Sequence, residues 1–278
     1  MLSLFKRYRL SRSAVPHISA FTFMTVCERV KPMSRVEFEF AQHSLELSSE
    51  WLYQQQSTPN YADAGHIVIE DKADFRFEDL ISRNLALSSV PVVLANCHEV
   101  LLKALPVIVL DNDEVGIIHI GHELALKQSL EPQVGSVFHF ALSRFANVRL
   151  FYMGIDPERV SGPMLEYAED LGCNWVTHQE SQFRHRSQLK TQLNHYMQHC
   201  DQLVLNIDLA SLVPGRSLDD HAVLDLQMVL RVVRHAVLSG KVRMIQLVGA
   251  KDKLIYSKQT KAIVDELCAL SAEVTVSE

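Results

Sequence analysis

The segment VPVVLANCHEV, residues 90–100, joins a short apolar run to an abruptly polar end. Val90–Ala95 has the continuous apolar character of a strand that is buried on both faces of a parallel sheet. The four residues that follow are Asn96, Cys97, His98 and Glu99. In open parallel sheets, ligands bind beyond the carboxyl ends of the strands, so this polar end is the first candidate for function.

The rest of the chain from Val36 onward repeats this alternation of β-type runs and helical patterns. Further strands are expected at 114–120, 148–154, 174–177, 202–208 and 243–248, and helices at 99–105, 163–171, 189–199, 224–238 and 257–270. Such alternation predicts right-handed crossovers and a three-layer α/β/α fold with a mainly parallel central sheet. No change in composition divides residues 36–278, which we therefore expect to form a single domain.

Composition excludes several classes of protein. The 278 residues are 47% apolar and 22% charged, which is ordinary for a globular chain, and no apolar run approaches the length of a membrane span. The net charge of −6 disfavours nucleic-acid binding, and neither of the usual glycine-rich nucleotide motifs occurs. Five widely spaced cysteines without a CxxC pair indicate a reduced, cytoplasmic protein.

The N-terminal segment differs from the rest in charge. Residues 1–32 carry a net charge of +5, which leaves −11 on the remaining residues. We expect residues 1–35 to be a basic extension that is either not structured or not translated, with Met33 as an alternative start. A chain that begins at Met33 should then fold as well as the full chain.

Polar motifs end four of the expected strands. They are Asn96–Val100, Ile120–Leu124 in IIHIGHELAL, Asn206–Ala210 in LVLNIDLASLVPG, and Gln246–Asp252 in QLVGAKD. An earlier segment, DAGHIV at 63–68, precedes them.

In order and spacing, these motifs resemble the ureohydrolase superfamily: arginase, agmatinase and above all formiminoglutamase. The family counterparts are GGGHE, DAHxD, [ST]xDxD, ExNPxxD and DAGDI. The resemblance implies an arginase-like fold, an oligomer, and hydrolysis of a guanidinium or formimino C–N bond by water held between two manganese ions.

The metal motifs are degenerate. By the resemblance, His98, His122 and Asp208 match metal ligands. The positions of the other three ligands, all aspartates in the family, hold Ile120, Leu124 and Ala210, and the acidic substrate contact is replaced by Gln246. One carboxylate leaves about three of the four metal charges uncompensated, at several kcal/mol for each buried charge. We therefore expect no catalytic residue and no bound manganese.

Three interpretations of the surviving residues stay open. His98 and His122 could be polar residues satisfied at strand ends, with Asp208 capping a loop. They could instead hold a single divalent metal, together with Glu123 or His119, or serve an altered hydrolase of linear amidines. The first interpretation predicts a non-catalytic relative that binds a small molecule or a protein in the former cleft, with no nucleic-acid or membrane partner. Cys97 is expected to be a packed thiol.

Overall fold

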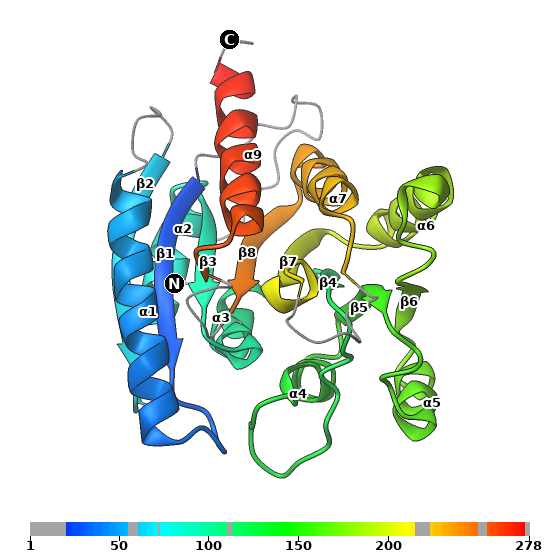
Figure 1. Cartoon of the computed structure of the whole chain (residues 1–278), viewed down its shortest axis with the longest axis horizontal. Coiled ribbons are helices and arrows are strands. Elements are labelled where there is room, and N and C mark those ends of the chain that lie inside the picture. The colour runs from blue at the N-terminus through cyan, green and yellow to red at the C-terminus, as the bar shows by residue number, and fades with distance from the viewer. Residues whose placement is uncertain are drawn as a thin grey trace, which may run out of the picture.

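Eight parallel strands form one sheet at the centre of the computed structural model, which describes residues 21–54, 61–71, 73–109, 113–214, 223–249 and 255–275 (Figure 1). The strand order is β2-β1-β3-β8-β7-β4-β5-β6, and every neighbouring pair is parallel. The strands are β1 (Phe21–Glu28), β2 (Tyr61–Ile69), β3 (Val90–Ala95), β4 (Val115–Ile120), β5 (Val148–Ile155), β6 (Asn174–Thr177), β7 (Gln202–Asp208) and β8 (Val242–Val248).

Helices cover both faces of this sheet (Figure 1). The first face packs against α1 (Arg35–Gln54), α6 (Arg186–Gln198), α7 (Leu226–Leu238) and α9 (Lys258–Thr275). The second face packs against α2 (Arg76–Ala86), α3 (Leu101–Ile108), α4 (Val137–Arg144) and α5 (Gly162–Asp170). The expected three-layer α/β/α fold with a parallel sheet is confirmed.

The central strands form because their sequences are apolar on both sides. All six residues of β3 and all six of β4 are buried. Alternate residues of each strand enter opposite apolar layers, since successive side chains point to opposite faces of a sheet. Ile118 and Ile120 pack in the first layer, whereas Val115 and Ile117 pack in the second.

The expected N-terminal extension must be corrected, because part of it lies inside the sheet. β1 pairs with β2 on one side and with β3 on the other. The side chains of Phe23, Met24 and Val26 are fully buried, and each such burial stabilises the fold by about 1.5–3 kcal/mol. The domain therefore includes residues 21–35, and loss of β1 would expose β2 and β3. Residues 1–20 lie outside the described residues.

Every strand and helix expected after residue 90 is present, with boundaries shifted by a few residues. The sequence pattern did not predict α1, β2, α2 or α4. Among the described helices, none combines the length and apolarity that a bilayer crossing requires.

Candidate functional site

Four adjacent strands bring the polar motifs together at one edge of the sheet. β3, β8, β7 and β4 are neighbours in that order, and all are parallel, so their carboxyl ends meet. The register pairs His119 with Asn206 and Asn206 with Gln246, which places these three side chains on the same face. Asp252, in the last predicted motif, lies outside the described residues.

Asn206 lies at the centre of a buried hydrogen-bonded cluster. Its side-chain nitrogen Nδ2 is 3.0 Å from Nδ1 of His98 and 3.2 Å from Nδ1 of His119. Its oxygen Oδ1 accepts a hydrogen bond from Nε2 of Gln246 at 3.3 Å. Asn206 and Gln246 are fully buried, and His119 is 1% exposed. We call these four residues the Asn206 cluster.

The backbone fixes which way the amides point. Nε2 of Gln246 lies 3.2 Å from the carbonyl oxygen of His98, so that atom must be the amide nitrogen, which donates. Oδ1 of Asn206 must then face Gln246, and its Nδ2 faces Nδ1 of both imidazoles. Each Nδ1 also has an acceptor within hydrogen-bond distance. Oδ1 of Asn206 lies 3.3 Å from Nδ1 of His98, and the backbone carbonyl oxygen of Asn206 lies 3.2 Å from Nδ1 of His119.

His119 has the most apolar surroundings in the cluster. Its ring centroid lies 4.9 Å from that of Phe138 and 5.7 Å from that of Tyr152. Its Nε2 donates to the carbonyl of Glu123 at 3.2 Å. Burial, reinforced by the neighbouring ring of His98, holds the pKa of His119 well below its usual range. The lowered pKa favours the neutral form of this imidazole.

Asp208 follows the cluster on β7 and serves a structural role. Its Oδ1 accepts the backbone N–H of Ala210 at 2.9 Å, and its carbonyl accepts the hydroxyl of Ser211 at 2.6 Å. The carboxylate therefore caps the turn at 209–211.

His122 lies apart from the Asn206 cluster. Its Nδ1 is 2.9 Å from the carbonyl oxygen of Gly154 on β5, and its ring is 6.0 Å from that of His178. Nowhere in the described ranges do three or more His, Cys, Asp or Glu side chains group so as to hold a metal ion. The structure thus does not bring His98, His122 and Asp208 together as a donor set.

The expected position of Ile120 is wrong. Ile120 pairs with Ile207, is fully buried, and packs in the first apolar layer, on the face opposite Asn206. The position beside Asp208 belongs to Gly121, where an added Cβ would lie 3.2 Å from Cβ of Asp208 and 2.7 Å from Nε2 of His119. Within the DAHxD-like motif, Gly121 rather than Ile120 therefore faces Asp208. Leu124 is also buried, in the second layer.

Two carboxylates near this edge were not singled out as site residues. Glu99 is 2% exposed, and its Oε1 accepts the backbone N–H groups of Gly135 and Ser136 at 2.8 and 3.2 Å. Burial raises the pKa of Glu99. Burial also raises the pKa of Glu28 to about 7, against the opposing effect of Lys103. Both acids line a cavity of about 390 Å³. In the sequence, only the charge of Glu99 directly after a buried strand pointed to either of these two carboxylates.

The thiol of Cys97 is buried, and this burial raises its pKa well above the usual range. It is the packed, unreactive thiol that the sequence predicted.

The chain order, the parallel sheet and its coverage by helices are those of solved ureohydrolases. The structure superposes on a variant of formiminoglutamase from Trypanosoma cruzi with Mn²⁺ at a TM-score of 0.72 and 15% identity, over 92% of this chain and 94% of that one. This chain has the arginase fold.

Other solved structures with this fold give the same picture. Agmatine ureohydrolase of Thermoplasma volcanium superposes at a TM-score of 0.71 and 13% identity, over 96% of this chain and 94% of that one. Arginase from Bacillus subtilis superposes at 0.69 and 12% identity, over 90% and 98%. No protein-family model and no curated protein sequence matches this chain.

The described donors do not fit a pair of manganese ions. Nδ1 of His98 and of His119 lies within hydrogen-bond distance of Asn206, so a metal ion at either nitrogen would have to displace that contact. The residue beside Asp208 on the neighbouring strand end is Gly121, which has no side chain that could bind a metal ion. Asp208 itself is engaged as a cap. One carboxylate cannot balance the four positive charges of two divalent ions.

Proposed function

We propose that this protein is a non-catalytic relative of the arginase-fold hydrolases. The observation that carries the proposal is the position of Asn206, whose amide lies within hydrogen-bond distance of two imidazoles at the edge of the sheet where the motifs meet. The Asn206 cluster supplies internally the contacts that metal ions would otherwise provide.

A metal ion bound at this site would have to replace existing hydrogen bonds. Binding through Nδ1 of His98 or His119 would break a hydrogen bond to Asn206, and each such bond contributes about 0.5–1.5 kcal/mol. Unpaired buried polar atoms would cost about 1–3 kcal/mol more each. Mn²⁺ lies at the weak end of the affinity order of divalent metals, so a few neutral donors give it little in return.

The substrate side of the site supports the same proposal. Gln246 occupies the position of the family carboxylate that binds a cationic substrate. It is fully buried, and its Nε2 donates to the carbonyl oxygen of His98. A neutral amide that points its donor into the protein cannot balance a guanidinium charge. A ligand in the former cleft and an oligomeric state remain predictions.

The test combines metal content with activity. Protein purified in excess Mn²⁺ and dialysed should retain well under a pair of ions per chain by elemental analysis. Formiminoglutamate, arginine and agmatine should be hydrolysed no faster than in a blank. A stoichiometry near a pair of ions, with a Mn²⁺-dependent rise in Tm, would overturn the proposal.

The second candidate is a hydrolase of linear amidines that uses a single metal. One observation favours it: the rings of His98 and His119 lie 5.3 Å apart, centroid to centroid, so two imidazoles are already adjacent. On this candidate, turnover of formiminoglutamate is measurable and is abolished in His98→Ala. In His195→Ala, which removes an exposed imidazole on α6, turnover should be unchanged.

A further inference from the structure

A second cavity lies between α6 and α7, on the outer side of the first helix layer. Its volume is about 380 Å³. Its apolar part comes from Leu189, Leu193, Met228, Val232 and Leu238. The remaining lining is basic or polar and consists of Arg186, Ser187, Lys190, Arg231, Arg234 and His235. We call this cavity the α6/α7 groove.

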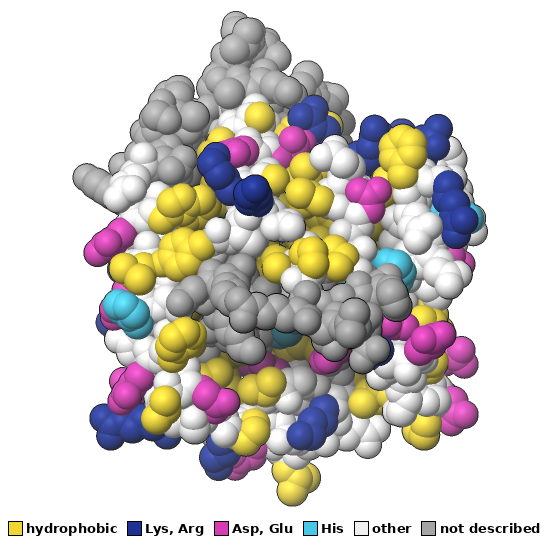
Figure 2. Space-filling view, in the orientation of Figure 1, with side chains coloured by type: hydrophobic (Ala, Val, Ile, Leu, Met, Phe, Trp, Pro, Cys, Tyr) yellow, Lys and Arg dark blue, Asp and Glu magenta, His cyan; other side chains and the backbone are white. Residues whose placement is uncertain are grey.

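The α6/α7 groove is positively charged in a protein whose net charge is −6. No acidic residue is among those that line it. Figure 2 shows Lys and Arg side chains gathered beside apolar side chains around α6. Because like charges crowd together here without a counter-charge in the lining, the groove is electrostatically complementary to an anion.

The two arginines at one end are held in place by an aromatic ring. The guanidinium carbons of Arg186 and Arg231 lie 4.5 and 5.3 Å from the centroid of Phe183. Such cation–π contacts orient a guanidinium and leave its N–H donors available. Arg234 differs, because its Nε pairs with Glu266 of α9 at 2.5 Å.

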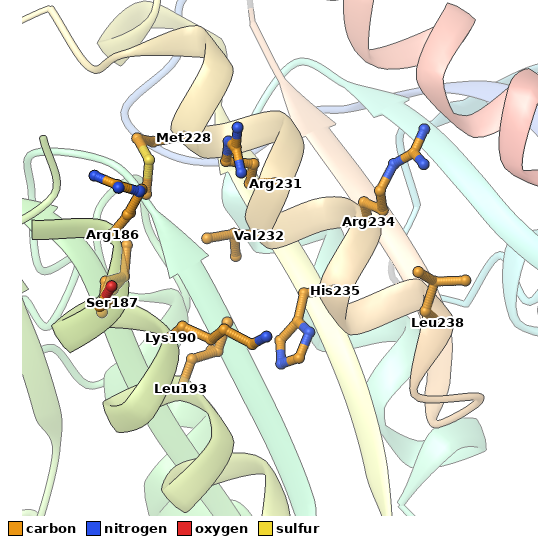
Figure 3. Close-up of a pocket in the computed structure, with 11 residues that line it drawn as sticks. Arg186, Ser187, Lys190, Leu193, Met228, Arg231, Val232, Arg234, His235 and Leu238 are labelled. Carbon is orange, nitrogen blue, oxygen red and sulfur yellow. The ribbon is translucent and has the colours of Figure 1, made fainter. Parts of the chain in front are cut away.

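At the other end, Lys190 extends toward His235 (Figure 3). Nε2 of His235 contacts Oδ1 of Asn194 at 2.5 Å. Burial and the charge of Lys190 both lower the pKa of His235. Within the described residues, no carboxylate forms an ion pair with Lys190, so its ammonium has no counter-charge in the groove.

We propose that the α6/α7 groove binds a small amphipathic anion, with an apolar body over Val232 and a carboxylate or phosphate head attracted by Lys190 and Arg231, the cations on either side of Val232 (Figure 3). The volume falls within the range of about 300–1,000 Å³ that is usual for small-molecule sites. The apolar floor favours an alkyl or aryl body over a fully hydrated ion such as sulfate. This site is separate from the Asn206 cluster and does not depend on the function proposed above.

The experiment compares three probes that share one apolar body. Octyl phosphate, octanoate and 1-octanol are titrated into the full-length protein, and binding is measured by calorimetry and by shifts in the NMR spectrum. We expect saturable binding of at least one of the two anions, at least about tenfold tighter than that of 1-octanol. The stronger anion identifies the preferred head group.

Matched variants locate the site. Lys190→Gln with Arg231→Gln should weaken the anion at least about tenfold, whereas Arg243→Gln, which changes an exposed arginine on β8, should leave the affinity unchanged. Equal binding of 1-octanol, no saturable binding of either anion, or unchanged affinity in the double variant would overturn the proposal. Binding of an acidic peptide where both octyl anions fail would also overturn it. The probe comparison needs no variant, so poor folding of the double variant leaves the proposal falsifiable.

Discussion

The side-chain nitrogen of Asn206 lies 3.0 Å from Nδ1 of His98, across 108 residues of sequence. A metal ion at that nitrogen would have to displace this contact. The same amide group lies 3.2 Å from Nδ1 of His119 and accepts a hydrogen bond from Gln246. A single side chain of β7 therefore links residues from the carboxyl ends of β3, β4 and β8.

Replacing Asn206 by aspartate should make stability depend on pH. A carboxylate cannot donate, and its negative charge beside the rings favours a protonated imidazole, so the folded-state pKa of His119 should rise. A raised imidazole pKa adds stability below its unfolded value, near 6.5, and that stability is lost as pH rises through the folded pKa. We expect Asn206→Asp to lose about 1–3 kcal/mol relative to wild type at pH 8, and less at pH 6.

Urea unfolding at the two pH values measures this loss. The control is Asn206→Ala, which removes the same hydrogen bonds without adding a charge and should lose similar stability at both values. If Asn206→Asp matched Asn206→Ala at both pH values, the amide of Asn206 would not face the two imidazoles.

Ile120→Asp should unfold the protein, and manganese should not rescue it. Ile120 is fully buried in the first apolar layer, beside Ile207, so the new carboxylate would be buried without a partner. We expect a loss of more than about 4 kcal/mol, against about 0.5–1.5 kcal/mol for the control Ile120→Val. Circular dichroism with and without Mn²⁺ measures both. A folded Ile120→Asp protein whose Tm rises with Mn²⁺ would mean that residue 120 faces the cleft after all.

Strand β1 should be indispensable to the fold. Phe23 is fully buried in it, whereas Phe40 of α1 is 52% exposed. Phe23→Ala should lose about 3–5 kcal/mol and Phe40→Ala less than about 0.5 kcal/mol, as measured by guanidinium chloride unfolding. A chain that starts at Met33 lacks β1 altogether and should not give a cooperative unfolding transition. Wild-type stability in that shortened chain would contradict the strand order.

Glu28 should make the protein less stable as pH rises from about 5 to about 8. Burial raises its folded pKa from 4.5 to about 7, so between those values the unfolded chain releases a proton that the folded chain keeps. Stability is therefore lost through this window, by up to about 3 kcal/mol. Glu28→Gln, which cannot ionise, should flatten the dependence and be more stable than wild type at pH 8.

Denaturant unfolding at pH 5, 6.5 and 8 measures the effect of Glu28→Gln. The exposed Glu158→Gln serves as the control and should follow wild type at every pH. Parallel curves for wild type and Glu28→Gln would show that Glu28 is solvated in the folded protein.

The sequence by itself was enough to predict the central strands and the three-layer α/β/α arrangement. β3 is a continuous apolar run and β4, β7 and β8 are mostly apolar, because a strand covered by helices on both faces has no side that must be polar. Polar residues directly after these runs located the edge at which the candidate site lies. Capping by Asp208 was one of the interpretations that the sequence left open, and the contact itself is local, reaching only two residues along the chain.

Only the tertiary structure decided that β1 belongs to the central sheet and which residues form the candidate site. β1 follows a strongly basic segment, and its place between β2 and β3 is set by pairing with residues 40 and 69 positions away. The direction of Ile120 depends on register, since a shift of one residue turns every side chain of a strand to the opposite face. Likewise, Asn206 becomes central only because β7 lies between β4 and β8, which brings amides and imidazoles from distant motifs within hydrogen-bond distance.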